Sequence, residues 1–169
     1  MKKILLTLIF AATALCFIGC GKGDVYMQRQ SFDNYTWQRL EGNNSVVFDN
    51  INIEDTSGVY DIYVSLRHTP YINEKAIKFL MQITTPDGIT RESVHTINLM
   101  DRFKEKWAGD AMGDLIDIEE VCRNFVSFPV KGNYKITLTN LGTYVQTVGI
   151  MDIGLRIKKS DIEGYKNAE

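Results

Sequence analysis

Cys20 is the residue whose neighbours most clearly specify a chemical modification. Two lysines near the start are followed by an apolar run from Ile4 to Ala14, and the small residue Gly19 directly precedes the cysteine. A basic start, an apolar stretch and a small residue before the cleavage point form a secretory signal. A cysteine directly after the cut is where bacterial lipoproteins are acylated. We therefore expect residues 1–19 to be removed as a signal peptide and Cys20 to carry lipid, including palmitate.

Two alternatives to a cleaved lipoprotein signal are open. The first is an uncleaved membrane anchor, but the apolar stretch 4–18 is shorter than the roughly 20 residues that a spanning helix needs. The second is an ordinary signal peptide with a chance cysteine, because Phe17 stands where lipoprotein signals usually carry Leu, Val or Ala. The small residue at the cleavage position favours the lipoprotein interpretation.

The remaining chain has the size of one domain and no excess of basic charge. Without the first 19 residues, 150 of the 169 remain, and loss of the two lysines changes the formal net charge from −2 to −4. A chain of this length buries about two-thirds of the surface that its unfolded form exposes. Nucleic-acid binding depends on clustered Lys and Arg, so we expect no nucleic-acid partner.

Few other residues form a pattern that is typical of catalysis or metal binding. His68 and His95 lie far apart and lack paired-ligand spacing, so each is interpreted as a strand side chain. The segment Asp110–Glu120 is rich in carboxylates and is the best calcium candidate, although it lacks the alternating pattern of a dedicated loop and a solvated acidic loop is the alternative. Cys122 has no partner for an internal disulfide and is interpreted as a small buried residue.

Neither a nucleophile set nor a phosphate-binding motif is present in the sequence. We therefore expect no enzyme activity, no cofactor and no small-molecule substrate. Two carboxylates that meet only in the folded chain, as in a glycoside hydrolase, are an open alternative.

Alternation of apolar and polar residues dominates the elements that must position these side chains. In Val59–Arg67 and Lys75–Thr84 every second residue is apolar, which predicts half-buried antiparallel strands. Pro86-Asp87-Gly88 predicts a turn. Further strands are expected over residues 26–32, 46–53, 89–99, 117–128, 134–139 and 147–158.

Three of these strands carry an expected irregularity. Residues 46–53 contain two competing inward sets, Val47 with Ile51 or Phe48 with Ile53, which a bulge would reconcile. Residues 117–128 also fit a short helix, but we favour an irregular edge strand. Glycines 149 and 154 within the last strand indicate a bulge or a close backbone contact.

Seven to nine strands separated by turn signals predict an all-β fold, an antiparallel β-sandwich or jelly roll. We expect this domain to cover residues 25–159. Residues 20–24 would form a lipidated linker before it, and residues 160–169 a polar tail after it.

Short segments along nearly the whole mature chain match, in order, those of one known family. They are Cys20, Leu66-Arg67-His68 with Tyr71 and Asn73, Thr85–Gly88, Lys106–Gly109 with Gly113-Asp114, Gly132–Tyr134 and Gly149–Ile157. On these residues the chain resembles the gliding motility-associated lipoprotein GldH family of Bacteroidetes. It departs from the family in the loop 141–146, where members tend to carry a Met-Arg pair.

The resemblance implies a non-enzymatic accessory lipoprotein that supports a gliding machinery tied to type IX secretion. Its expected partners are envelope proteins of that motility or secretion assembly, and its expected location is the outer membrane, on the periplasmic face or the cell surface. Only Cys20 carries over as a functional residue of the family. Trp107, Arg67 and Tyr71 are candidate partner contacts. The alternative function is a surface glycan-binding lipoprotein that stacks sugars on exposed aromatic rings such as Trp107.

Overall fold

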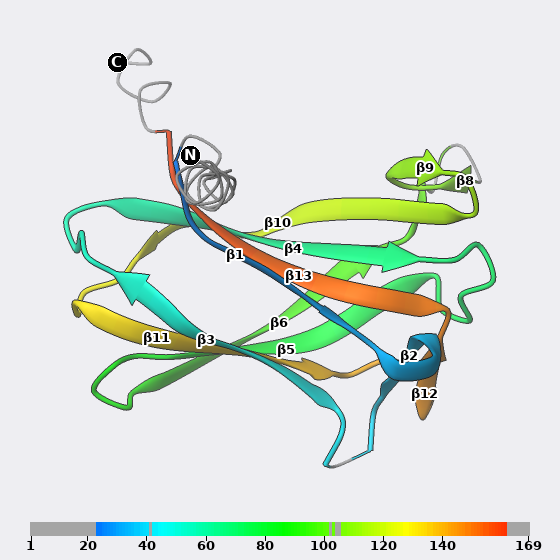
Figure 1. The fold of residues 1–169 in the computed structure, drawn as a ribbon, viewed down its shortest axis with the longest axis horizontal. Helices are drawn as coiled ribbons and strands as arrows, with labels where there is room; N and C mark the ends of the chain where they lie inside the picture. The colour runs from blue at the N-terminus through cyan, green and yellow to red at the C-terminus, as the bar shows by residue number, and fades with distance from the viewer. Residues whose placement is uncertain (1–22, 41, 102, 104–105, 162–169) are drawn as a thin grey trace, which may run out of the picture.

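Two antiparallel sheets face each other in the computed structural model, which describes residues 23–40, 42–101, 103 and 106–161 (Figure 1). The five-stranded sheet has the order β1-β13-β4-β10-β9, with the bounds Asp24–Ser31, Ile150–Lys159, Val59–His68, Leu115–Ser127 and Asp110–Met112. The four-stranded sheet has the order β3-β11-β5-β6, with the bounds Ser45–Ile53, Gly132–Asn140, Ala76–Thr84 and Thr90–Asn98. This architecture confirms the predicted all-β sandwich.

Two short ribbons and one helical turn complete the described part of the fold. β2 (Thr36–Gln38) pairs with β12 (Gln146–Val148), and β7 (Met100–Asp101) pairs with β8 (Lys106–Trp107). A single 3-10 turn, η2, covers Asp33–Tyr35. The expected signal peptide, Cys20 and residues 162–169 of the expected tail lie outside the described residues.

The core lies between the two sheets and is built from the alternating positions of their strands. In β4 and β5 the residues expected inside are buried, as the two-residue period requires. β11 contributes a third inward row to the facing sheet. These rows consist of Tyr60, Ile62, Val64 and Leu66, then Ile77, Phe79, Met81 and Ile83, then Tyr134, Ile136 and Leu138.

The bulge predicted in β3 is confirmed. The pairing of β3 with β11 shifts between Phe48 and Ile51, and Asn50 has a left-handed φ of 54°. The extra residue lets Phe48 and Ile51 both face the core, because it changes which side of the strand points inward. The expected inward position of Val47 is wrong, since this side chain is 42% exposed.

The single strand predicted over residues 147–158 is wrong, because Gly149 divides it into β12 and β13. Gly149 has φ +96°, and a Cβ at this position would lie 2.8 Å from the Ile72 Cα. Its backbone N–H donates to the Tyr35 carbonyl at 2.8 Å, and its own carbonyl accepts from the Thr69 N–H at 2.8 Å. The close backbone contact expected at Gly149 is therefore confirmed, and it redirects the chain from one sheet to another.

The strand predicted over residues 117–128 is confirmed up to Ser127. It belongs to β10, whose pairing with β4 shifts twice, between Val121 and Arg123 and between Arg123 and Val126. β9 pairs only with the segment Leu115–Asp117 of β10. The rest of β10 is thus an irregular sheet edge, as predicted.

The two ends of the sandwich differ in the length of their connections. The turn end contains the connections 54–58, 85–89 and 128–131, together with the start of β1 and the end of β13, which pair at Asp24 and Lys158 (left in Figure 1). The loop end contains the described parts of the connections 32–44, 69–75, 99–114 and 140–149, including both short ribbons (right in Figure 1). Longer loops are where proteins place variable binding residues on a fixed scaffold.

Candidate functional site

The connection 69–75 is held at the loop end by hydrogen bonds to the segment 141–149. The Asn73 backbone N–H donates to the Val148 carbonyl at 3.2 Å, and its side-chain Nδ2 donates to the Gln146 carbonyl at 2.9 Å. The Asn73 Oδ1 accepts from the Val148 N–H at 2.9 Å. This one asparagine extends the edge of β12 and joins two connections that are far apart in the sequence.

Glu74 forms the second link between the same connections. Its side chain is buried, and its Oε1 accepts from the backbone N–H groups of Thr143 at 2.8 Å and Tyr144 at 3.3 Å. A carboxylate that accepts backbone N–H groups makes charge-assisted hydrogen bonds, which are stronger than neutral ones. The connections 69–75 and 141–145 therefore form one rigid unit, which we call the paired loops.

The paired loops present aromatic rings to solvent. Tyr71 is 89% exposed, and Tyr144 is exposed on the neighbouring loop. Phe103 is 98% exposed, and Met112 is exposed as well, both within the connection 99–114 at the same end. Aromatic residues and methionine are enriched in protein interfaces, so this end has the composition of a binding surface. The sequence pointed to Tyr71 through its family motif, but nothing in it distinguished Tyr144 from other loop tyrosines.

Trp107 lies at the loop end but is only partly exposed. Its ring packs edge-on against the His68 ring, with centroids 5.2 Å apart. The remaining surface of the ring borders a groove of about 360 Å³ that Pro70, Ala111 and Ile116 also line. Trp107 thus contributes both to core packing and, next to the connection 69–75, to a small groove whose lining also includes Lys106 and Asp114.

His68 is fully buried at the end of β4. Its Nδ1 donates to the Thr69 carbonyl at 2.9 Å, while its Nε2 has no hydrogen-bond partner among the described residues. Burial lowers the pKa of His68, because a charged imidazole would lose its hydration there. The neutral ring therefore acts as a packing group beneath Trp107.

Arg67 lies on the outer face of the five-stranded sheet, opposite two carboxylates. Its Nε and Nη2 donate to the two carboxylate oxygens of Asp117, each at 2.7 Å. On the other side Arg67 is the register partner of Asp152, whose Oδ1 accepts from the Arg29 Nε at 2.7 Å. The hydrogen bonds from Arg67 lower the pKa of Asp117. The candidate contact Arg67 is therefore already engaged in an ion pair within the sheet.

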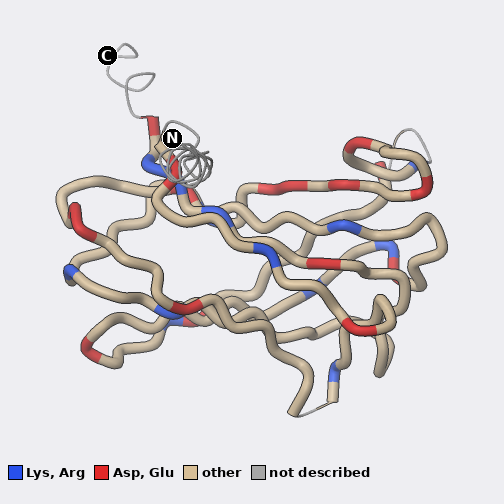
Figure 2. The backbone as a smooth tube through the Cα atoms, viewed as in Figure 1, with Lys and Arg blue, Asp and Glu red and all other residues tan. Residues whose placement is uncertain are grey.

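Further along the same face, Arg156 donates to Glu119 and lies over the Tyr63 ring, 4.2 Å from its centroid. Figure 2 shows acidic and basic positions interspersed along β1, β13, β4 and β10. Opposite charges on neighbouring strands stabilise the pairing modestly, by about 0.2–1 kcal/mol per pair. This face carries an ion-pair network between strands.

The acidic segment Asp110–Glu120 does not converge on one point. Its Asp117 pairs with Arg67 and its Glu119 with Arg156. Among the described residues, no group of three His, Cys, Asp or Glu side chains is placed to hold a metal ion. Asp117 and Glu119 therefore form ion pairs with arginines on neighbouring strands.

The remaining chemistry-bearing residues lie apart. His95 is on β6 of the four-stranded sheet, where its Nε2 lies 2.8 Å from the Ser93 Oγ and its ring stacks on Phe79. Cys122 is on β10, and burial raises the pKa of its thiol to about 12, with a smaller contribution from Glu120. A thiol with this pKa is a poor nucleophile at neutral pH.

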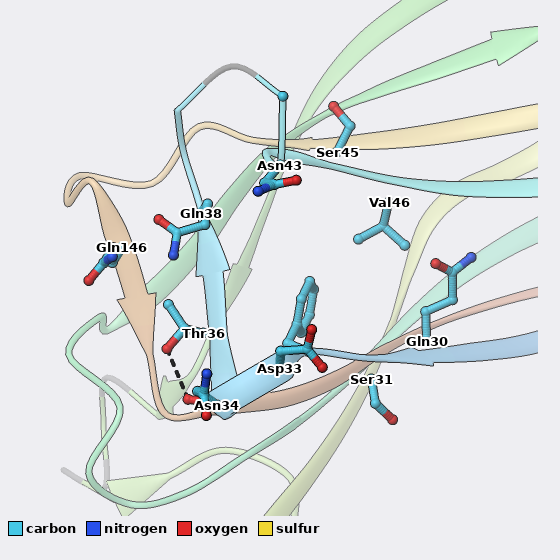
Figure 3. A pocket seen from close by; sticks show the side chains of 12 residues that line it. Gln30, Ser31, Asp33, Asn34, Thr36, Gln38, Asn43, Ser45, Val46 and Gln146 are labelled. Atoms are coloured by element: carbon cyan, nitrogen blue, oxygen red, sulfur yellow. Dashed lines mark hydrogen bonds between the residues drawn. The ribbon is translucent and has the colours of Figure 1, made fainter.

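A polar pocket that no sequence pattern indicated opens near the loop end, between β1 and β3 (Figure 3). Its volume is about 570 Å³, within the range of small-molecule sites. The residues that line it come mainly from the segments 30–38 and 42–46, with Gln146 from β12. Most of the lining side chains are neutral and polar. Such side chains also occur in ordinary solvated loops, so their residue types alone did not indicate a pocket.

Comparison with known proteins decides the family. Residues 24–157 match the family model described as GldH lipoprotein. The chain belongs to the GldH lipoprotein family. A GldH relative, the gliding motility lipoprotein GldH homolog of Christiangramia forsetii, is 25% identical over 168 residues, which cover 95% of this chain and 99% of the relative. The sequence resemblance is thereby confirmed.

Membership of the GldH family implies attachment to a membrane of the cell envelope through lipid. No helix within the described residues is long and apolar enough to cross a membrane. The family is named for gliding motility and for its lipid, not for a reaction.

Two solved structures illustrate a weak likeness to this GldH chain. A non-crystalline cellulose-specific carbohydrate-binding module has a TM-score of 0.39 and 10% identity, over 79% of this chain and 70% of the module. A carbohydrate-binding module in complex with β-1,4-galactotriose has a TM-score of 0.33 and 14% identity, over 82% of this chain and 92% of the module. At these scores and identities no functional relationship follows.

Proposed function

We propose that this GldH-family chain is a non-enzymatic accessory component of the gliding motility and type IX secretion machinery, which binds other envelope proteins through its loop end. The observation that carries the proposal is the set of exposed aromatic side chains on the rigid paired loops. Tyr71 and Tyr144 project from them, although the loops themselves are fixed by Asn73 and Glu74. A rigid surface loses little conformational entropy on binding.

The position of the chain's start supports the same surface. β1 begins at the turn end with Asp24, four residues after the expected lipid site Cys20. Four residues reach at most about 14 Å, whereas the eight residues of β1 extend about 26 Å toward the loop end. A lipid on Cys20 would therefore hold the turn end near the membrane and present the paired loops away from it. We propose that the membrane that holds this lipid is the outer membrane.

Crosslinking in cells tests which end meets the partner. A photo-reactive phenylalanine analogue replaces Tyr71 or Tyr144, and in matched controls it replaces Asp87 or Ile89 in the exposed turn 85–89 at the other end. Mass spectrometry then identifies the joined proteins. The proposal predicts motility or secretion components from positions 71 and 144. Equal yields of such components from the control positions would contradict the loop-end assignment.

Substitution tests whether the contact matters for function. Tyrosines at the centre of interfaces commonly contribute about 2 kcal/mol or more, so Tyr71→Ala with Tyr144→Ala should weaken partner recovery and reduce colony spreading or secretion. Ile89→Ala, an exposed apolar residue at the turn end, should change neither. Normal spreading and secretion in a strain that lacks the protein would reject the proposed function in that organism.

A further inference from the structure

The polar pocket occupies the open seam of the sandwich. β1 is the edge of one sheet and β3 the edge of the other, so within the described residues neither strand pairs with another strand on this side. Gln30 on β1 donates from its side-chain amide to the Val47 carbonyl on β3 and so bridges the seam. Toward the loop end the two edges separate around η2 and β2, which leaves the pocket between them (Figure 3).

The wall that β2 contributes is fixed from behind. Trp37 is 1% exposed, and its indole Nε1 donates to the Asn44 carbonyl at 3.1 Å, while its own carbonyl accepts from the buried Asn140 Nδ2 at 3.0 Å. Phe32, which lines the pocket, stacks on Trp37 with centroids 5.4 Å apart. The pocket is therefore held open by core contacts in the free protein.

The backbone at Asn34, which lines the pocket, is also unusual. Asn34 and Tyr35 are consecutive residues that both have φ of 52°, in the left-handed region that non-glycine residues seldom adopt. Strained backbone of this kind persists where surrounding structure enforces it, and it is concentrated at binding sites. Here the Tyr35 carbonyl is held by the Gly149 N–H at 2.8 Å.

The side chains that line the pocket are mostly primary amides and hydroxyls. Gln38 and Gln146 are register partners across β2 and β12, on the face opposite to the buried Trp37. Their amides, and those of Asn34 and Asn43, make no side-chain hydrogen bond within the described part of the chain. Each primary amide offers two donors and one acceptor. Ser31, Thr36 and Ser45 add hydroxyl groups.

The charge of the lining limits the class of ligand. Among the described lining residues, Asp33 is the one ionisable side chain, and no lysine or arginine is present. An anion would find no cation there, and it would meet the carboxylate of Asp33. A neutral ligand with many hydroxyl groups, each both donor and acceptor, matches the amides instead. The half-buried Phe32 ring adds an apolar surface against which the C–H groups of such a ligand can pack.

The geometry points to a neutral-sugar site in this seam, at which the amides of Gln38, Asn43 and Gln146 hydrogen-bond the hydroxyl groups of an envelope glycan. This inference goes beyond the proposed partner binding and does not depend on it. The pocket uses residues distinct from Tyr71 and Tyr144, so either surface can be removed without the other.

The test is binding of the purified full-length lipoprotein, in detergent, to a printed array of neutral and acidic glycans. Titration calorimetry with the strongest neutral glycan then compares the wild type with Gln38→Ala and Asn43→Ala. Loss of one hydrogen bond to a ligand hydroxyl should raise the Kd about tenfold. Asn98→Ala, an exposed asparagine on the remote strand β6, is the matched control and should leave the Kd unchanged. Unaltered urea unfolding of each variant shows that the fold is intact.

Binding of a neutral glycan that both pocket variants weaken supports the site. Whether that glycan is N-acetylated or contains only simple hexoses then identifies the type of sugar that the pocket binds. Three results would overturn it: retention of no neutral glycan, retention of acidic glycans only, or equal affinity in the wild type and the pocket variants. Partner crosslinking from position 71 is unaffected by any of these results, so failure here is distinguishable from failure of the proposed function.

Discussion

Asn140 is the residue whose replacement best tests how the loop end is held together. It is 1% exposed at the end of β11, and its Nδ2 donates to the Trp37 carbonyl at 3.0 Å and to the Thr147 Oγ1 at 3.3 Å. Its Oδ1 accepts from the Gly142 N–H at 2.7 Å. One side chain thus joins the four-stranded sheet to the β2–β12 ribbon and to the paired loops.

Replacement by alanine removes these hydrogen bonds and leaves the buried Gly142 N–H without its partner, and an unpaired buried group costs about 1–3 kcal/mol. The Trp37 carbonyl also faces Thr147 in the β2–β12 ladder, so it loses one bond worth about 1 kcal/mol. We therefore expect Asn140→Ala to lower the free energy of unfolding by about 2–4 kcal/mol. Thr147→Val removes only the longest of the three bonds and keeps the shape, so its expected cost is about 1 kcal/mol.

Urea unfolding followed by circular dichroism measures these differences. With a slope of about 2 kcal/mol per molar urea, Asn140→Ala should lower the midpoint by about 1–2 M. The matched control is Asn133→Ala, an exposed asparagine near the other end of the same strand, which should shift the free energy by less than about 0.5 kcal/mol. An Asn140→Ala variant as stable as the Asn133→Ala variant would refute the role assigned to this network.

Three further predictions concern titratable groups. Because burial raises the pKa of Cys122 to about 12, a thiol reagent at pH 8 should label the native mature protein slowly and the urea-unfolded protein completely; equally fast labelling of both would contradict this. The hydrogen bonds from Arg67 lower the folded-state pKa of Asp117, so their stabilisation is present above about pH 4 and is lost as the pH falls further. Asp117→Asn should cost about 1 kcal/mol or less at pH 7, and the difference in stability between variant and wild type should shrink as the pH falls below about 4. Burial lowers the pKa of His68, so near pH 6.5 and somewhat below it the unfolded chain binds a proton at this histidine that the folded chain does not bind. The free energy of unfolding therefore decreases as the pH is lowered through that range. His68→Phe should reduce that slope between pH 7.5 and 5.5, and the remainder should come from His95, whose pKa burial also lowers.

The family motifs acquire physical reasons once the contacts are known. Asn73 joins the paired loops, Gly149 permits the close approach of β12 to Ile72, and His68 packs beneath Trp107. Each of these residues shapes the loop end from within. Tyr71, in contrast, is an exposed motif residue, and it is the one to which the proposed function gives a partner contact.

The local pattern of the sequence determined the strands, because the alternation of side chains in a strand is a property of the strand itself. The rows in β4 and β5 and the irregularity of β3 followed from which residues are apolar. The expectation of a signal segment likewise rests on charge and hydrophobicity alone. Neither inference needs knowledge of which strands become neighbours.

Tertiary structure decided everything that depends on strand pairing and on contacts between distant loops. The order β1-β13-β4-β10 places Arg67 between Asp117 and Asp152, and this order depends on how all inward rows are buried together. The break at Gly149 depends on the approach of Ile72, a contact between distant parts of the chain. The seam pocket exists only because two sheet edges separate around η2, so its amides looked like ordinary loop residues until the fold brought them together.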